Sequence, residues 1–185
     1  VLRETCRQVM KWTASGFELP QVSVNLSVKQ LERPEFVETL QAILEETGIE
    51  PGRLKLEITE SVVMAVDDAF TLLDRLRKIG ISLALDDFGT GYSSLSYLKM
   101  LPVQQLKIDR SFVIGIGQNP EDEAIIRSVM ALAQSLNFEV VAEGVETAEQ
   151  AAFLSASGCH QLQGFLHGSA VAPAEFRARW SSLPR

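Results

Sequence analysis

The sequence has few cysteines, no long apolar run and no excess of positive charge. Its two cysteines, Cys6 and Cys159, lie far apart without a CxxC spacing, so neither a disulfide framework nor a thiolate zinc site is expected. No stretch approaches the roughly 18 uninterrupted apolar residues of a membrane span. The N-terminal run with Arg3, Glu4 and Arg7 does not have the form of a signal peptide. These absences point to a cytoplasmic domain, although a parent protein could be tethered to a membrane.

The charge balance bears on the kind of partner. A formal net charge of −7 argues against polymeric nucleic acid, whereas a small phosphate ligand could still be held locally by metal ions. With 185 residues, of which 46% are hydrophobic and 22% charged, the chain has the composition of one globular domain.

Apolar periodicity predicts helices and short β-rich runs that alternate along the chain. The predicted helices cover residues 2–14, 34–47, 67–79, 121–136, a segment that starts at 147, and 173–180. The predicted strands cover residues 22–27, 54–59, 82–87, 105–109, 139–145 and 160–165. Thr147 and Gln150 have the spacing of a capping box, and the helix at 121–136 carries an apolar face that includes Ile125 and Ile126. Such alternation of strand and helix is typical of a parallel sheet.

Each predicted strand has a polar residue near its C-terminal end. These residues are Asn25, Glu57, Asp86 with Asp87, Lys107, Glu143 and Gln163. In a (β/α)8 barrel the C-terminal ends of the strands form one ring, where the chemistry of this fold takes place. Any one of these residues alone could be a solvated group at a loop edge, but their joint occurrence favours a shared site.

The residue types in this ring indicate the chemistry. Its amide and carboxylate members offer hard oxygen ligands, which favour Mg²⁺ or Mn²⁺ over zinc. The adjacent Asp86 and Asp87 could serve or bridge two ions about 3.5–4 Å apart, an arrangement that activates a water for displacement at phosphorus. Hydrolysis of a phosphodiester is therefore the favoured reaction. Lys107 could orient or deprotonate that water if the metals lower its pKa, or it could form a salt bridge to a neighbouring acid.

Six motifs follow one another across nearly the whole chain. They are VNLS at 24–27, EITES at 57–61, DDFGTGYSSL at 86–95, LKIDRSFV at 106–113, AEGVET at 142–147 and QGF at 163–165. In these motifs and their order the chain resembles the EAL-domain phosphodiesterases of bacterial cyclic di-GMP signalling. The resemblance implies a TIM-like (β/α)8 barrel that hydrolyses cyclic di-GMP to linear pGpG with two Mg²⁺ or Mn²⁺ ions per site.

The resemblance also implies roles for individual residues. The implied metal ligands are Asn25, Glu57, Asp86, Asp87 and Glu143. The implied catalytic residues are Lys107, which acts on the water, Glu143, which completes the metal-water site, and Glu60, which steadies the loop after DDFGTG. The implied substrate-side residues are Asp109, Gln163 and Glu146. Of all these, Glu60, Asp109 and Glu146 could equally be capping or salt-bridge residues.

The chain departs from the family in two places. The Glu-Ala-Leu motif that names the family is absent, since the nearest string, at 123–126, lies on a predicted helix. With six predicted strands where a barrel of about 250 residues has eight, residues 1–185 are interpreted as an EAL domain that lacks its N-terminal strand or strands. Because the missing glutamate is a metal ligand in the family, this chain alone is expected to bind metal poorly and to hydrolyse little or no cyclic di-GMP. The family's Lys-Pro or Arg-Pro pair after QGF is also absent, and His160 and His167 in this region are assigned no role.

Two hypotheses of different class follow. The first is a metal-dependent cyclic di-GMP phosphodiesterase, and the second is an inactive module of the same fold that binds cyclic di-GMP or a partner protein. A receptor could lose Asp86, Asp87, Lys107 or Glu57 and keep its pocket, so the presence of all four favours the enzyme. Another metal-dependent barrel that acts on a different phosphoester would share the fold but not the motifs. The resemblance further suggests a homodimer, with the DDFGTG loop and a helix at 93–100 near its interface, and an attached sensor or GGDEF domain.

Overall fold

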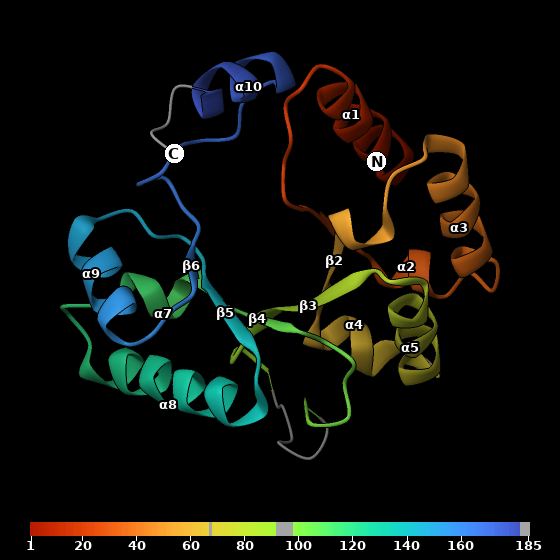
Figure 1. Ribbon diagram of the computed structural model, residues 1–185. Helices are drawn as coiled ribbons and strands as arrows, with labels where there is room; N and C mark the ends of the chain where they lie inside the picture. The colour runs from red at the N-terminus through yellow and green to blue at the C-terminus, as the bar shows by residue number, and fades with distance from the viewer. Residues whose placement is uncertain (67, 92–97, 182–185) are drawn as a thin grey trace.

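The computed structural model describes residues 1–66, 68–91 and 98–181 (Figure 1). The helices in these ranges are α1 (Leu2–Ala14), α2 (Val28–Leu31), α3 (Phe36–Thr47), the 3-10 helix η1 (Pro51–Arg53), α4 (Glu60–Ala65), α5 (Ala69–Ile79), α7 (Arg110–Ile114), α8 (Pro120–Leu136), α9 (Ala148–Ala156) and α10 (Pro173–Ser181). The strands are β1 (Val22–Asn25), β2 (Leu54–Thr59), β3 (Ser82–Phe88), β4 (Gln105–Ile108), β5 (Glu139–Ala142) and β6 (Gln161–Leu162). Most of the helix predicted at 93–100 lies outside the described residues.

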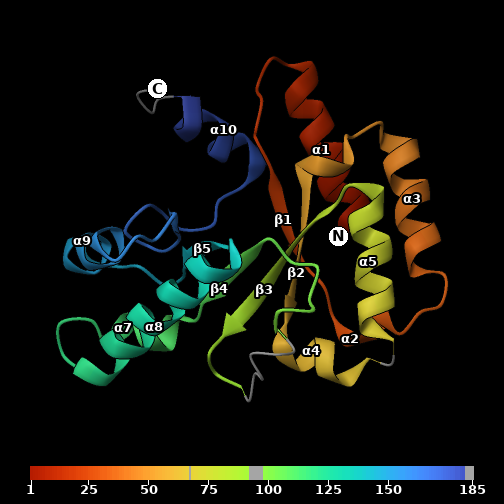
Figure 2. The same ribbon diagram turned by 60° about the horizontal axis from the view of Figure 1, so that its bottom comes forward.

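The six strands form one parallel sheet in which they are ordered as in the sequence, from β1 at one edge to β6 at the other. Helices surround the curved sheet, and the turned view shows α3 and α5 side by side on one flank with α7 and α8 on the other (Figure 2). Six parallel strands in chain order with helices outside them have the arrangement of a TIM-like (β/α)8 barrel. The predicted fold class, with six strands present, is confirmed.

The two faces of the sheet differ in polarity because successive side chains of a strand point to opposite sides. One set of alternate positions packs into the hydrophobic core under the helices, and its members are Leu54, Leu56, Ile58, Leu83, Leu85, Leu106, Ile108, Val140 and Ala142. The other set includes the buried polar residues Lys55, Glu57, Asp86, Gln105 and Lys107. Four of these five side chains line a hollow of about 340 Å³. The outer face of the sheet is therefore apolar and the inner face polar.

Helix boundaries follow the capping signals of the sequence. The side-chain oxygen of Thr147 accepts a hydrogen bond from the Gln150 backbone N–H, and Gln150 completes the predicted capping box of α9. Gly80 ends α5 with φ of +100°, a left-handed conformation that glycine adopts without strain. No helix among the described residues combines the length and the apolar character that a bilayer crossing requires.

Three strands end two or more residues earlier than predicted, β4 ends one residue early, and one apolar residue was placed wrongly. The strands β1, β5 and β6 end two or more residues early, so Glu143 and Gln163 lie in the turns just after their strands rather than within them. After β5 the Glu143 N–H still donates a hydrogen bond to Ile108 O at 3.1 Å, and Gly144 then adopts φ of +68°. On α8, Ile126 is fully buried as expected, whereas its neighbour Ile125 is 37% exposed. Adjacent residues of a helix are rotated by about 100° about its axis, so the side chains of Ile125 and Ile126 cannot both point directly at the sheet.

The two neighbouring isoleucines of α8 provide a matched test of the core. Ile126→Ala should lower the free energy of unfolding by about 2–5 kcal/mol, because it leaves a cavity in a packed core. Ile125→Ala should change it by less than about 1 kcal/mol, since the side chain is partly solvated and alanine favours the helix. Urea unfolding with an unchanged m-value measures both, and equal losses would contradict this description of α8.

Candidate active site

The polar ring predicted from the strand ends assembles around Lys107. The ammonium Nζ of Lys107 lies 2.7 Å from Glu57 Oε2, 3.0 Å from Asp86 Oδ1 and 2.6 Å from Glu143 Oε1. These groups come from β2, β3, β4 and the turn after β5, and parallel strands bring their C-terminal ends to the same edge. The Lys107 side chain is only 4% exposed, so the sheet encloses a buried cation among three carboxylates.

The environment of Lys107 favours its charged form. Burial lowers the pKa of the ammonium, but the hydrogen bonds to Glu143 and Glu57 and the charges of Glu57 and Asp86 outweigh this effect. The pKa of Lys107 consequently lies above its usual range. The salt bridge that was one of the two readings of Lys107 is present, with three acids instead of one. The other reading, in which bound metal ions lower the pKa of Lys107, stays a prediction.

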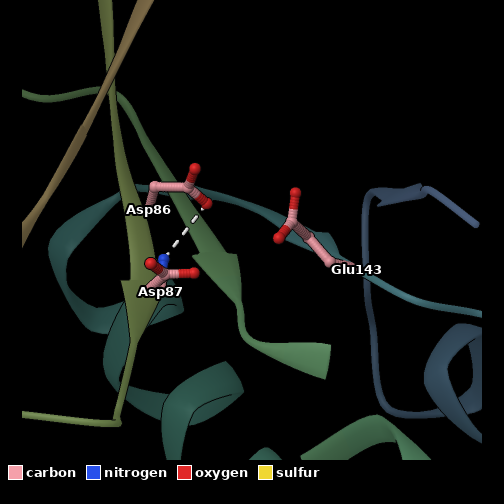
Figure 3. Close-up of side chains that lie close together, drawn as sticks. All are labelled: Asp86, Asp87 and Glu143. Carbon is pink, nitrogen blue, oxygen red and sulfur yellow. Dashed lines mark hydrogen bonds between the residues drawn. The ribbon is translucent and has the colours of Figure 1, made fainter. Parts of the chain in front are cut away.

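Asp86, Asp87 and Glu143 form a cluster of carboxylates beside Lys107 (Figure 3). One oxygen of each lies within 4.8 Å of the others. Adjacent residues of a regular strand point to opposite faces, but the β3 pairing with β4 is irregular between Leu85 and Phe88, and Asp87 has φ of +55°. This irregularity turns the Asp87 side chain toward the face on which Asp86 lies, as β-bulges next to active sites often do. In addition, the Asp87 N–H donates a hydrogen bond to Asp86 Oδ1 at 3.1 Å. Both aspartates can therefore face one site.

The cluster carries more negative charge than Lys107 balances. Burial raises the pKa of Asp87, and the charges of Asp86 and Asp109 raise it further against an opposing effect of Lys107. Burial also raises the pKa of Glu143, despite its hydrogen bond from Lys107. Four carboxylates surround one ammonium, which leaves a formal excess of three negative charges when all are ionised. Carboxyl groups held in this way favour an additional cation.

The remaining ligand and substrate candidates lie at the margin of this cluster. Asn25 is an exposed residue of the edge strand β1 and stands in register with Glu57. Gln163 is exposed in the turn after β6 and lines the same hollow as Glu57 and Lys107. A larger hollow of about 800 Å³ lies between α8 and α9, and none of the predicted site residues lines it.

Two of the three residues for which capping or salt bridges were an alternative, Asp109 and Glu146, make such contacts. Asp109 caps α7, since its side chain accepts a hydrogen bond from the Ser111 N–H at 3.0 Å. Glu146 forms an ion pair with Arg110 at 2.7 Å. Glu60 accepts a long hydrogen bond from the Gly89 N–H at 3.4 Å, a contact within the DDFGTG segment that is neither a cap nor a salt bridge. These contacts describe the groups in the absence of substrate, and their roles in a reaction remain predictions.

Sequence reasoning missed a second polar layer on the inner face, one pleat below the ring. Lys55 is 8% exposed, and its Nζ donates a hydrogen bond to Gln105 Oε1 at 3.1 Å. Gln105 in turn donates from Nε2 to Glu139 Oε2 at 3.3 Å. The alternation of polar and apolar residues in LKLEIT and QLKID is the signal that could have identified this layer. His160 has a structural contact, because its Nδ1 accepts a hydrogen bond from the Val140 N–H at 3.0 Å.

The fold and the site define a class: a parallel α/β domain of the barrel type, with an acidic site built around a buried lysine at the C-terminal ends of its strands. The EAL domain family model matches residues 1–170. The chain belongs to the EAL domain family.

Relatives of known name agree with this assignment. The bifunctional diguanylate cyclase/cyclic di-GMP phosphodiesterase MucR of Pseudomonas aeruginosa is 44% identical over 176 residues, which are 95% of this chain and 26% of MucR. The solved complex of PaMucR phosphodiesterase with c-di-GMP superposes with a TM-score of 0.89 at 41% identity, covering 95% of this chain and 71% of that chain. The manganese/cy-diGMP complex of BlrP1 from Klebsiella pneumoniae has a TM-score of 0.78 at 34% identity, covering 89% of this chain and 43% of that chain. This chain spans about a quarter of the length of the curated relatives that it matches.

Removal of the Lys107 charge tests the electrostatics of the site. Lys107→Met should lower the free energy of unfolding at neutral pH by about 3–5 kcal/mol, because it leaves Glu57, Asp86 and Glu143 without their buried cation. The loss should shrink toward acid pH. Burial raises the pKa of Glu143, and Lys107 opposes this effect. Without the ammonium the folded variant therefore takes up a proton at Glu143 as the pH falls and is stabilised relative to the unfolded state. Urea unfolding at about pH 7 and about pH 5 measures both effects.

A matched control for this variant is Lys78→Met. Lys78 Nζ lies 2.8 Å from Asp74 Oδ2, but its side chain is 71% exposed, and exposed ion pairs contribute little to stability. Lys78→Met should therefore change stability little at either pH. Equal losses in the two variants, or a loss in Lys107→Met that does not depend on pH, would show that the buried ion pairs do not have the effect described.

Proposed function

We propose that the protein to which this chain belongs hydrolyses cyclic di-GMP to linear pGpG with the help of two Mg²⁺ or Mn²⁺ ions. The observation that carries the proposal is the cluster of Asp86, Asp87 and Glu143 next to a buried, charged Lys107. Its support is that this cluster occurs in an EAL domain similar to MucR, which is named as a cyclic di-GMP phosphodiesterase. The solved complexes of PaMucR and BlrP1 with cyclic di-GMP point to the same ligand.

The donor set fits hard divalent cations. The cluster offers only carboxylate oxygens, its members approach one another within 4.8 Å, and its negative charge exceeds that of the Lys107 ammonium, which contacts two of its members. Asp86, Asp87 and Glu143 would hold the ions, with Glu57 and the neighbouring Asn25 as further oxygen ligands. Bound ions of this kind activate water and neutralise charge on the phosphoryl oxygens.

The protein's own side chains arrange this site before substrate binds. Lys107 holds the carboxylates of Glu57, Asp86 and Glu143 at hydrogen-bonding distance, so that little reorganisation is needed during the reaction. Lys107 lies among the carboxylates that would hold the ions, so its ammonium would orient the attacking water or a phosphate oxygen, or would help to deprotonate that water if the bound ions lower its pKa. In the reaction the water oxygen bonds to phosphorus and the P–O3′ bond breaks. One proton of the water is passed to the 3′ oxygen, and the other stays with the new phosphate group or leaves to solvent.

A second proposal concerns the surroundings of the site. Gln163 and Asp109 would lie on the substrate side of the ring, and Glu60 would hold the DDFGTG loop through Gly89. The homodimer, the cytoplasmic location and an attached sensor or GGDEF domain remain predictions.

A chromatographic assay of the natural protein that contains these residues tests the proposed reaction. The protein should convert cyclic di-GMP to pGpG with Mn²⁺ or Mg²⁺ and not with a chelator. Asp86→Asn should lower the rate by at least about 100-fold, because it removes a carboxylate shared by Lys107 and the metal site.

The control is Asp74→Asn, which changes an aspartate to asparagine on the exposed side of α5, where Asp74 pairs with Arg77 and Lys78. It should leave the rate within about twofold of the unchanged protein, as expected for a surface substitution. Metal-dependent binding of cyclic di-GMP without any product would instead identify a receptor. Absence of both binding and turnover would overturn the proposal.

A further inference from the structure

The turn that carries Glu143 is covered by a side chain to which the proposed reaction assigns no role. This turn, residues 143–146, follows β5 and contains Gly144 with φ of +68°. The aliphatic part of Arg110 lies against Gly144: a Cβ placed on Gly144 would overlap Arg110 Cγ and lie 2.7 and 2.8 Å from Arg110 Cβ and Cδ. Only glycine fits here, both because of its conformation and because Arg110 takes the space that a side chain would need.

The head group of Arg110 holds the far end of the same turn. Its Nη2 lies 2.7 Å from Glu146 Oε1, so the side chain spans the turn from Gly144 to Glu146. The turn is also fixed through its backbone: the Glu143 N–H donates to Ile108 O at 3.1 Å, and the Glu146 N–H donates to Gln150 Oε1 at 2.8 Å. Arg110 is the first residue of α7, immediately after the capping residue Asp109. It therefore joins the start of α7 to the turn after β5.

We infer that Arg110 is a positioning residue, which sets the place of Glu143 in the carboxylate cluster by clamping residues 143–146. This inference rests on the proposed function, since the purpose of the clamp is the correct placement of Glu143 for metal ions and water. Glu143 is the first residue after β5, which ends at Ala142, and its backbone N–H is tied to the sheet by the hydrogen bond to Ile108 O. Its carboxylate must nevertheless stay within 2.6 Å of Lys107 and close to Asp86 and Asp87.

Packing and charge act together in this clamp. The two side chains of the ion pair are 52% and 39% exposed, and such pairs alone contribute little. The close contact of the Arg110 stem with Gly144 adds a shape constraint that an exposed pair lacks. Arg110→Ala removes both contributions, whereas Arg110→Lys keeps a long stem and a positive charge.

Two measurements on the natural protein test the clamp. In Arg110→Ala, the amide protons of Glu143, Val145 and Glu146 should exchange with solvent about tenfold faster, because the turn opens more often. Mn²⁺ affinity, measured by direct titration, should fall by about tenfold, as is usual when a residue that orients metal ligands is lost. Arg110→Lys should restore most of both properties, which general destabilisation of the fold would not explain.

The matched control is Arg75→Ala. Arg75 on α5 pairs with Glu38 on α3 at 2.6 Å in a comparably exposed ion pair that lies away from the site, and its loss should leave both readouts unchanged. Unchanged amide exchange at residues 143–146 in Arg110→Ala would overturn the clamp, whether or not the protein hydrolyses cyclic di-GMP. If the unchanged protein showed no turnover, the proposed function would fail, while amide exchange would still decide the role of Arg110.

Discussion

The ammonium of Lys107 is the interaction on which the inner face of the sheet depends. Carboxylates removed from water are costly unless a cation and hydrogen bonds compensate them. Glu57, Asp86 and Glu143 reach the same ammonium at 2.6 to 3.0 Å. One lysine on β4 thus allows two strands and one turn to bring acidic side chains together inside the domain. Because it balances only part of their charge, it also leaves the acidic character on which a metal site depends.

The two faces of the sheet divide stability and chemistry between them. TIM barrels usually fill their interior with branched apolar side chains, but here the inner positions of β2 and β4 carry Lys55, Glu57, Gln105 and Lys107. Burial of apolar side chains against helices occurs on the outer face instead, where Leu56, Leu83 and Leu106 are fully buried. The outer layer stabilises the sheet, and the inner layer can hold polar groups in fixed places. Stability of this fold therefore depends on the helices around the sheet more than on its interior.

The chain segments at the ends of β3 and β5 place side chains in directions that a regular strand does not allow. The irregular pairing at the end of β3 turns Asp87 toward the side on which Asp86 lies, and Gly144 lets the chain after β5 lie directly under Arg110. Each device uses a left-handed backbone conformation at one residue. Strand ends thus place the site roughly, and these two turns determine where the individual carboxylates lie.

Local pattern in the sequence determined the elements and the chemical type of the site. Alternating apolar residues in LKLEIT, capping residues such as Thr147, and polar residues at the strand ends depend on spacing along the chain, so they could be recognised without a structure. Tertiary structure alone decided how the charges pair: Lys107 and Glu57 are 50 residues apart in the sequence, and the choice between a base and a salt-bridge partner depends on which side chains the folded sheet brings around the ammonium. Only the tertiary structure also decided that Ile125 is partly exposed, that Asp109 caps a helix and that Arg110 packs on Gly144. These outcomes depend on contacts between distant segments and on one-residue changes of backbone conformation, and neither leaves a periodic signal in the sequence.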